Sequence, residues 1–313
     1  MSGHVRSIRT SLFALLLIGL LAGSRAAARG QAPTFYEKLA FGRIVVAGTC
    51  LEQGRRALVQ VDEVFKGQLP SQRISIAYRG QNWDRSPGQP KIEFHLGERS
   101  ILMLEAESTE HGSTPEEARF VLAGGCDGKV DLPAEGSEAL LEAARRIVQI
   151  QSQSDQNEIW EGQRHLLQEK NPLLVEAGFQ EVLKFRLGNP AMVPLLTRYL
   201  ADPHDSFRLA SLRVFAQILE RSRQRGDELP GAERLRLDIL SVARGDTSAE
   251  VRAQAVRTLK VSGRPDLREV MAQMAGSDPS QIVRYEAQLA LMEINRSTAR
   301  SSDDTSVSSG QKP

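Results

Sequence analysis

The sequence predicts an α+β protein of two domains: a small five-stranded antiparallel β barrel followed by an all-α solenoid of stacked helical hairpins. Two observations lead to this prediction. Short β-branched and apolar runs separated by turn-forming residues fill residues 35–135. A pattern with helical spacing is written three times between residues 190 and 295. A length of 313 residues, with 41% apolar and 25% charged residues, agrees with two globular domains.

The repeated pattern starts with an aspartate and continues into a helix. An apolar residue stands five positions after each aspartate, and an arginine follows it directly. Counted from that apolar residue, a small residue stands four places on and a large apolar residue eight places on, which keeps them on one helix face. In this order, the copies are Asp202, Phe207, Arg208, Ser211 and Phe215; Asp246, Val251, Arg252, Ala255 and Leu259; and Asp278, Val283, Arg284, Ala287 and Leu291.

These three copies resemble HEAT or HEAT-like repeats, in which each unit is a pair of antiparallel helices. The resemblance implies that the aspartate and the arginine tie loops and neighbouring units together. An aspartate before a helix can also accept hydrogen bonds from N–H groups of the first turn. The small residues allow close helix approach and the large ones fill the remaining space. We expect structural roles for all of them.

The amino terminus has the order of a secretory signal peptide. Residues 1–10 carry two arginines and no acid, residues 11–22 are almost wholly apolar, and small residues follow. We expect cleavage after Ser24 or Ala28, a signal peptide of 1–28, and a secreted or periplasmic mature chain. The apolar run is shorter than the roughly 20 residues that span a bilayer, so no stable membrane span is expected after cleavage. A retained amino-terminal anchor is the alternative.

Export affects the interpretation of Cys50 and Cys126, which are the two cysteines of the chain. In an oxidising compartment a pair of cysteines in one small domain favours a disulfide over a metal site or a nucleophile. We therefore predict a Cys50–Cys126 disulfide. Two free thiols are the alternative.

The region 35–135 contains five strand-like runs, at 44–51, 57–65, 73–78, 100–105 and 120–123. The phrases at 47–49, 64–67 and 94–99 resemble the netrin/TIMP-like OB barrel of bacterial exported proteins. The tissue-inhibitor branch of that family blocks metalloproteases with a cysteine at its mature amino terminus. Here the first cysteine is Cys50, well inside the domain, which puts that mechanism in doubt.

The remaining chain divides by composition. Residues 136–157 form a connecting helix and a polar linker, with helical spacing over 137–151. The HEAT-like solenoid covers 158–295. The Ser- and Thr-rich residues 296–313 are expected to be a disordered tail.

Charge and motifs exclude several classes of function. The net charge of +1 becomes −2 once signal cleavage removes Arg6, Arg9 and Arg25, and this near-neutral balance does not favour nucleic-acid binding. The sequence lacks the nucleophile-elbow, P-loop, His-Glu-x-x-His and Cys-x-x-Cys motifs, and its histidines are scattered. We expect no enzymatic activity, no catalytic residue, no metal site and no cofactor. A hydrolase whose site is assembled from dispersed residues is the alternative.

The sequence therefore predicts an exported interaction or scaffold protein that binds a protein partner on the concave face of a short α-solenoid. In HEAT-like units the second helix of each pair lines that face. The outward side chains expected there are Arg213, Gln217, Gln254, Arg257, Glu286 and Glu293. The alternative is that the OB/TIMP-like domain carries the function, as a protease inhibitor or a ligand-binding module.

Overall fold

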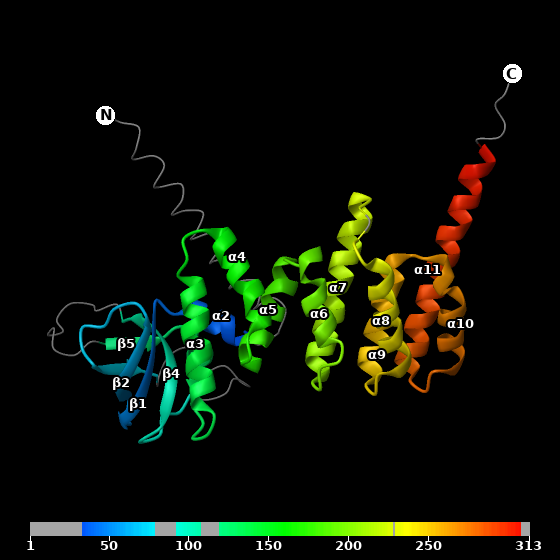
Figure 1. Cartoon of the computed structure of the whole chain (residues 1–313). Coiled ribbons are helices and arrows are strands. Elements are labelled where there is room, and N and C mark those ends of the chain that lie inside the picture. Colours follow the sequence, from blue (N-terminus) through cyan, green and yellow to red (C-terminus); the bar gives the residue numbers. More distant parts are fainter. Residues whose placement is uncertain (1–32, 79–91, 108–118, 228, 308–313) are drawn as a thin grey trace, which may run out of the picture. The chain divides into compact units, whose positions relative to one another are not determined.

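The computed structural model describes residues 33–78, 92–107, 119–227 and 229–307. The chain divides into two compact units, Met1–Gln153 and Ser154–Pro313 (Figure 1). The predicted signal peptide lies outside the described residues. Each unit is described by itself below.

The first unit is built on one sheet. Its strands are β1 (Ile44–Glu52), β2 (Arg56–Lys66), β3 (Arg73–Ala77), β4 (Arg99–Ala106), β5 (Arg119–Leu122) and β6 (Lys129–Asp131). The order is β1-β2-β3-β5-β4-β6, and β1 also pairs with β4, so five strands close into a ring. The expected antiparallel pairing is wrong for β3 and β5, which are parallel. The sixth strand, β6, was not predicted, because three residues are too few to show an alternating pattern.

The ring requires close strand approach at Gly48 of β1. A Cβ atom at this position would lie 2.6 Å from Val59 Cγ1 and 2.7 Å from the Gln60 carbonyl oxygen on β2. Inside the ring, the Tyr78 and Phe94 rings pack with centroids 4.8 Å apart, and the Tyr78 hydroxyl donates to the Gly54 carbonyl oxygen at 3.1 Å. The ring therefore encloses an apolar core of its own.

Two helices complete this unit. Helix α2 (Phe35–Phe41) begins with a capping box, in which the Glu37 amide donates to Thr34 Oγ1 and the Thr34 amide donates to Glu37 Oε2. Helix α3 (Ser137–Gln151) contacts α2 and β2. Arg145 of α3 also forms an ion pair with Glu63 of β2.

The predicted Cys50–Cys126 disulfide is not shown by this structure, in which Cys50 has a free thiol. Cys50 lies buried on β1 with a free thiol whose Sγ donates to the Glu52 carbonyl oxygen at 3.4 Å, and burial raises the pKa of this thiol. Cys126, whose side chain is outside the described part, belongs to the 3-10 turn η2 (Gly125–Gly128), between β5 and β6.

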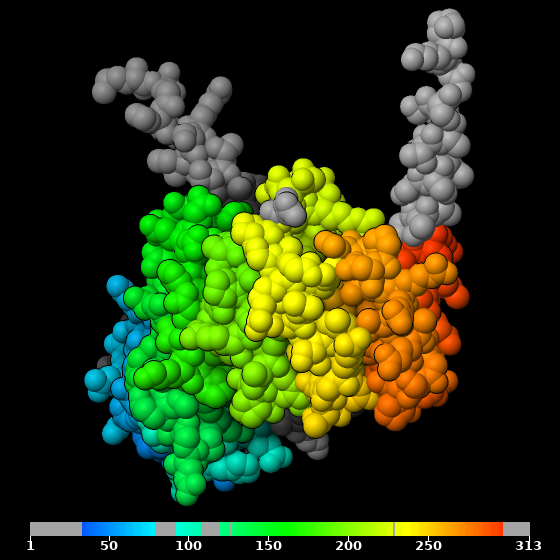
Figure 2. Space-filling model, turned by 45° about the vertical axis from the view of Figure 1, so that its right-hand side comes forward, coloured from blue at the N-terminus to red at the C-terminus, as the bar shows by residue number. Residues whose placement is uncertain are grey.

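The described part of the second unit is built of helices. Its α-helices are α4 (Gln156–His165), α5 (Pro172–Phe185), α6 (Val193–Tyr199), α7 (Asp205–Arg225), α8 (Ala232–Gly245), α9 (Ala249–Ser262), α10 (Arg268–Ser277) and α11 (Gln281–Val307), with 3-10 turns η3 (Leu166–Gln168), η4 (Pro190–Met192) and η5 (Pro265–Leu267). The pairs α6–α7, α8–α9 and α10–α11 are hairpins, and α5, α7, α9 and α11 contact one another in that order. Within this unit, the sequence colours form adjacent bands in Figure 2, as expected when each hairpin packs on its neighbours.

The repeated small and large positions face the core of this unit. Ser211, Ala255 and Ala287 are fully buried, as the pattern predicted. The Ser211 hydroxyl donates to the Leu196 carbonyl oxygen of α6 at 2.8 Å, so this small residue also links the two helices of its hairpin.

Helix α11 continues to Val307, where we expected a disordered tail from residue 296 onward. Extending a helix that packing has already nucleated costs little, because each added residue gains one backbone hydrogen bond. Residues 296–307 also contain neither glycine nor proline.

Candidate functional site

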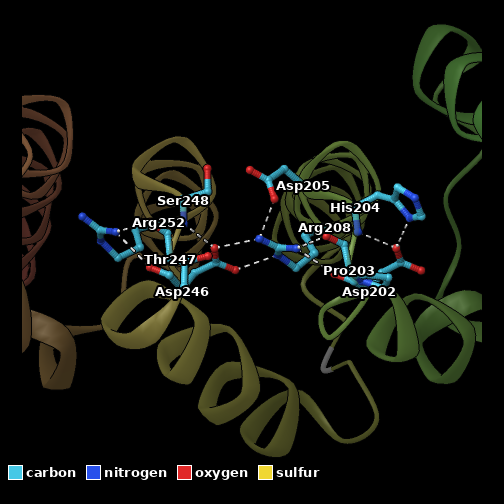
Figure 3. A network of polar contacts seen from close by, with 9 residues as sticks. All are labelled: Asp202, Pro203, His204, Asp205, Arg208, Asp246, Thr247, Ser248 and Arg252. Carbon is cyan, nitrogen blue, oxygen red and sulfur yellow. Dashed lines mark hydrogen bonds and ion pairs between the residues drawn. The ribbon is translucent and has the colours of Figure 1, made fainter.

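A ladder of arginine–aspartate pairs connects the three hairpins. Arg208 of α7 donates from Nε to Asp246 Oδ2 at 2.8 Å and from Nη2 to Asp246 Oδ1 at 3.0 Å (Figure 3). Arg252 of α9 repeats this with Asp278, at 3.0 Å for both bonds. Such two-bond pairing fixes distance and orientation together. Each pair therefore joins one repeat to the next.

The remaining guanidinium nitrogen of each arginine binds the loop of its own repeat. Nη1 of Arg208 donates to the Asp202 and Pro203 carbonyl oxygens at 2.7 and 3.2 Å. The same bonds run from Arg252 to Asp246 and Thr247, at 2.9 and 3.3 Å, and from Arg284 to Asp278 and Pro279, at 2.7 and 3.0 Å. One side chain thus holds two loops.

Each aspartate also closes its own loop before the helix starts. The amides of His204, Ser248 and Ser280 donate to Oδ1 of the aspartate two positions earlier, at 2.9, 2.8 and 2.8 Å. This bond orients the carboxylate before the neighbouring arginine meets it. The spacing of aspartate and arginine in the sequence is therefore the spacing of this loop and the first helical turn.

The two arginine–aspartate pairs between repeats, called the inner rungs below, are largely buried. The side chains of Arg208 and Asp246 are 9% and 7% exposed, and those of Arg252 and Asp278 are 10% and 8% exposed. The hydrogen bonds that Arg208 donates to Asp246 raise the pKa of Arg208, and those that Arg252 donates to Asp278 raise the pKa of Arg252. Burial opposes ionisation of Asp278, but the bonds from Arg252 and the Ser280 amide outweigh it and lower the pKa of this carboxyl. Arg208, Arg252 and Asp278 are thus held in their charged forms.

Residues 237–304 match the family model for HEAT repeats. The helical half of this chain is a HEAT-like repeat region. The match includes the Asp246, Arg252, Asp278 and Arg284 positions of the ladder, and it confirms the resemblance predicted from them. Neither a curated protein nor a solved structure matched the chain.

Three of the six residues predicted to face a partner contact one another between α9 and α11. Arg257 of α9 donates from Nη1 to Gln254 Oε1 at 3.4 Å, and its Nη2 lies 2.9 Å from Glu286 Oε1 of α11. Gln254 and Glu286 are each only 7% exposed, whereas the Arg257 side chain is 38% exposed. Neighbouring helices therefore cover two residues that the helical spacing alone placed outward.

The other three predicted residues differ in accessibility. Gln217 of α7 is half-buried and donates to the Leu183 carbonyl oxygen of α5 at 3.0 Å. Arg213 of α7 is exposed, and Glu293 of α11 is partly exposed. Arg213 is therefore the one fully exposed member of the predicted set, and Gln217, Arg257 and Glu293 are partly exposed.

One linking residue was missed by the sequence analysis. Thr258 of α9 is fully buried, and its hydroxyl donates to the Leu212 carbonyl oxygen of α7 at 3.0 Å. A hydroxyl on the apolar face of a helix was the signal that could have indicated it.

Three other features of the described part of the molecule concern small-molecule pockets, metal sites and membrane spans. A cavity of about 50 Å³ between α7, α8 and α9, lined by Leu219, Ile239 and Leu259 among others, is far below the roughly 300–1,000 Å³ of small-molecule pockets. No group of three or more His, Cys, Asp or Glu among the described residues is placed to hold a metal ion. Within the same ranges, no helix combines the length and the apolar character needed to cross a bilayer.

Proposed function

We propose that this protein is an exported, non-enzymatic scaffold that binds a protein partner along α7, α9 and α11, on the concave face of a short solenoid. The observation that carries the proposal is the ladder. It repeats one geometry from hairpin to hairpin, so equivalent positions of successive helices line up. A surface made in this way is long and continuous, which suits a protein segment better than a small molecule.

The charge of this surface indicates the chemistry of the partner. Arg213 and Arg257 follow the ladder arginines Arg208 and Arg252 by the same five positions, so they occupy equivalent places on neighbouring helices. Glu286 neutralises Arg257 in part, whereas no ion pair of Arg213 occurs among the described residues. We therefore expect a partner segment that carries acidic side chains.

The experiment that tests the proposal compares Arg213→Glu with Arg268→Glu. Arg268 is an exposed residue of α10, outside the row of α7, α9 and α11, so its substitution makes the same charge change elsewhere. Each variant of the mature protein is used to capture partners from its own envelope extract, and capture is quantified by mass spectrometry. A partner that wild type and Arg268→Glu retain and Arg213→Glu loses supports binding along α7, α9 and α11. Equal capture by all three proteins contradicts it.

Arg257 needs a milder change, because a glutamate at this position would face buried Glu286. Arg257→Gln keeps hydrogen-bonding capacity and removes the charge. We expect it to weaken capture less than Arg213→Glu, since part of the Arg257 charge is already neutralised.

Export is the second part of this proposal and has a test of its own. The signal-like residues 1–28 support it. The intact mass of the protein purified from its own cells should correspond to a chain that begins after Ser24 or Ala28. A mature chain that keeps residue 1 would contradict export by signal cleavage.

The second candidate function is a binding or protease-inhibiting role of the sheet unit. The closed ring β1-β2-β3-β5-β4 favours it, because a ring of this kind is what the OB-like resemblance implies. A chain ending at Gln153 would separate the two candidates. If this fragment captures the same partner, the sheet unit carries the function. If removal of the helical unit abolishes capture, the surface along α7, α9 and α11 carries it.

A further inference from the structure

Arg284 is the last arginine of the ladder, and no aspartate or glutamate among the described residues pairs with it. Arg284 of α11 binds its own loop as Arg208 and Arg252 do. The Nε and Nη2 atoms of those two residues hold the aspartate of the next repeat. Among the described residues, no such carboxylate lies on Arg284. The charged group is therefore positioned for an arginine–aspartate pair that the described residues do not complete.

The helix face beside Arg284 is likewise left open. The first position after Arg252 is Ala253 and the fourth is Val256, and both are fully buried in α9, which has neighbouring helices on two sides. The equivalent positions of α11 are Tyr285 and Gln288. Both are exposed, Tyr285 by 56%.

Apolar surface continues along this face. Met292 stands seven positions after Tyr285, two helical turns further on, and is 55% exposed. The terminal repeat of a soluble solenoid needs a polar outer face. Here two large apolar side chains stand where internal repeats receive their neighbour.

We propose that this face of α11 docks a helical segment of a partner protein that begins with an Asp or Glu cap. The partner carboxylate would accept from Nε and Nη2 of Arg284, in the geometry of the two inner rungs. An apolar side chain behind the cap would cover Tyr285 and Met292. This surface is distinct from the row that contains Arg213 and Arg257, and the inference does not rest on that row.

The charge of the open rung favours a different protein over a second copy of this chain. Asp246 and Asp278 of a second copy would be buried and held by their own arginines, and the Asp202 carboxylate, 22% exposed, already contacts His204. Joining two copies by their last helices would place one Arg284 toward the other. A carboxylate that is free at the start of a helix is the group that fits.

A chain with one added repeat tests the chemistry of this end. Residues 264–295 are duplicated directly after Asn295, so the copied Asp278 follows Arg284 by 26 positions, as Asp278 follows Arg252. We expect a higher Tm than that of the original chain. In the extended chain, Asn in place of the copied aspartate should lower Tm, and this effect should disappear when Arg284→Gln is also present. An aspartate effect that is independent of Arg284 overturns the proposal.

A synthetic peptide of residues 264–296 provides the test in trans, with full-length chain and fluorescence polarisation. The peptide with Asp278→Asn should bind about tenfold more weakly or worse, since it lacks the charged hydrogen bonds. The Arg284→Gln chain should bind both peptides equally, and the Arg213→Glu chain should behave as wild type. Equal binding of both peptides by wild type contradicts the proposal. If the peptide does not bind at all, the extended chain gives the deciding result.

Two further measurements identify other occupants of this face. Light scattering that shows a dimer, lost with Met292→Glu, would assign the face to a second copy. Hydrogen exchange at residues 285–292 that is slow in the isolated chain and becomes fast when residues 297–313 are removed would assign it to the end of this chain. Either result overturns the proposal.

Discussion

The sheet unit and the helical unit are each stabilised internally by a different kind of contact. In the sheet unit, β1 pairs with β2 and with β4, and each pairing has its own register. In the helical unit, one contact is repeated: an arginine in the first turn of a helix holds the aspartate of the next repeat. A repeated contact leaves a repeated pattern in the sequence, and a single contact does not.

The two units also differ in what they bury. The interior of the ring is apolar, with Tyr78 as a polar group whose hydroxyl is satisfied by the Gly54 carbonyl oxygen. The helical unit buries two ion pairs between its hairpins. Buried ion pairs contribute little net stability, but breaking one partner is expensive. The sheet unit should therefore be most sensitive to shape, and the helical unit to loss of a charge.

The largest effect is expected for Asp246→Ala. This change leaves the Arg208 guanidinium buried without its carboxylate and should lower the free energy of unfolding of the helical unit by about 3–5 kcal/mol. Asp205→Ala is the matched control, since Asp205 contacts the same arginine but its side chain is 57% exposed, and it should cost less than about 1 kcal/mol. Urea unfolding followed by circular dichroism measures both. Equal effects would show that burial is not what makes the rung important.

Overpacking between the helices should have the next largest effect. Ala255→Leu adds volume where the side chain is fully buried, and we expect a loss of about 1–3 kcal/mol. Ala272→Leu makes the same change at an exposed position of α10 and should be near neutral. A tolerated Ala255→Leu would contradict close helix packing at the small positions.

A change confined to the sheet unit tests whether the two units are independent. Gly48→Ala places a methyl group against Val59 and the Gln60 backbone of β2 and should cost about 1–3 kcal/mol. Gly54→Ala is the control, since the nearest atom would be 3.6 Å from the new Cβ. In Gly48→Ala, hydrogen exchange should become faster in β1 and β2 and stay unchanged in α7 and α9. Faster exchange in both units would show that they unfold together.

The smallest effect is a dependence of the helical unit on acid pH. The pKa of Asp278 is lowered by folding, so its contribution to stability is present above the unfolded value of about 3.9 and is lost as pH falls through the folded value. The stability difference between wild type and Asp278→Asn should therefore be constant near neutral pH and shrink below about pH 4. Urea midpoints of the two proteins at several pH values measure this. A difference that stays the same in acid would contradict an ionised rung.

Some features of both units were out of reach of the sequence. Gln254 and Glu286 occupy outward positions by helical spacing, but both are buried in the folded unit. The parallel pairing of β3 with β5 depends on β4, which pairs with β5 and with β1. Each of these features is set by neighbours that are distant in the chain.

The sequence by itself determined the repeat: its aspartate, its arginine, and its small and large positions. It could do so because the loop and the first helical turn are local structures, and their hydrogen bonds require fixed spacing along the chain. Only the tertiary structure decided that Arg208 and Arg252 bind the aspartate of the following repeat. It also decided that Arg257 pairs with Glu286, and that Arg284 has no such carboxylate among the described residues. These pairings depend on how the hairpins stack, and burial within that stack decides which charges are covered and which stay accessible.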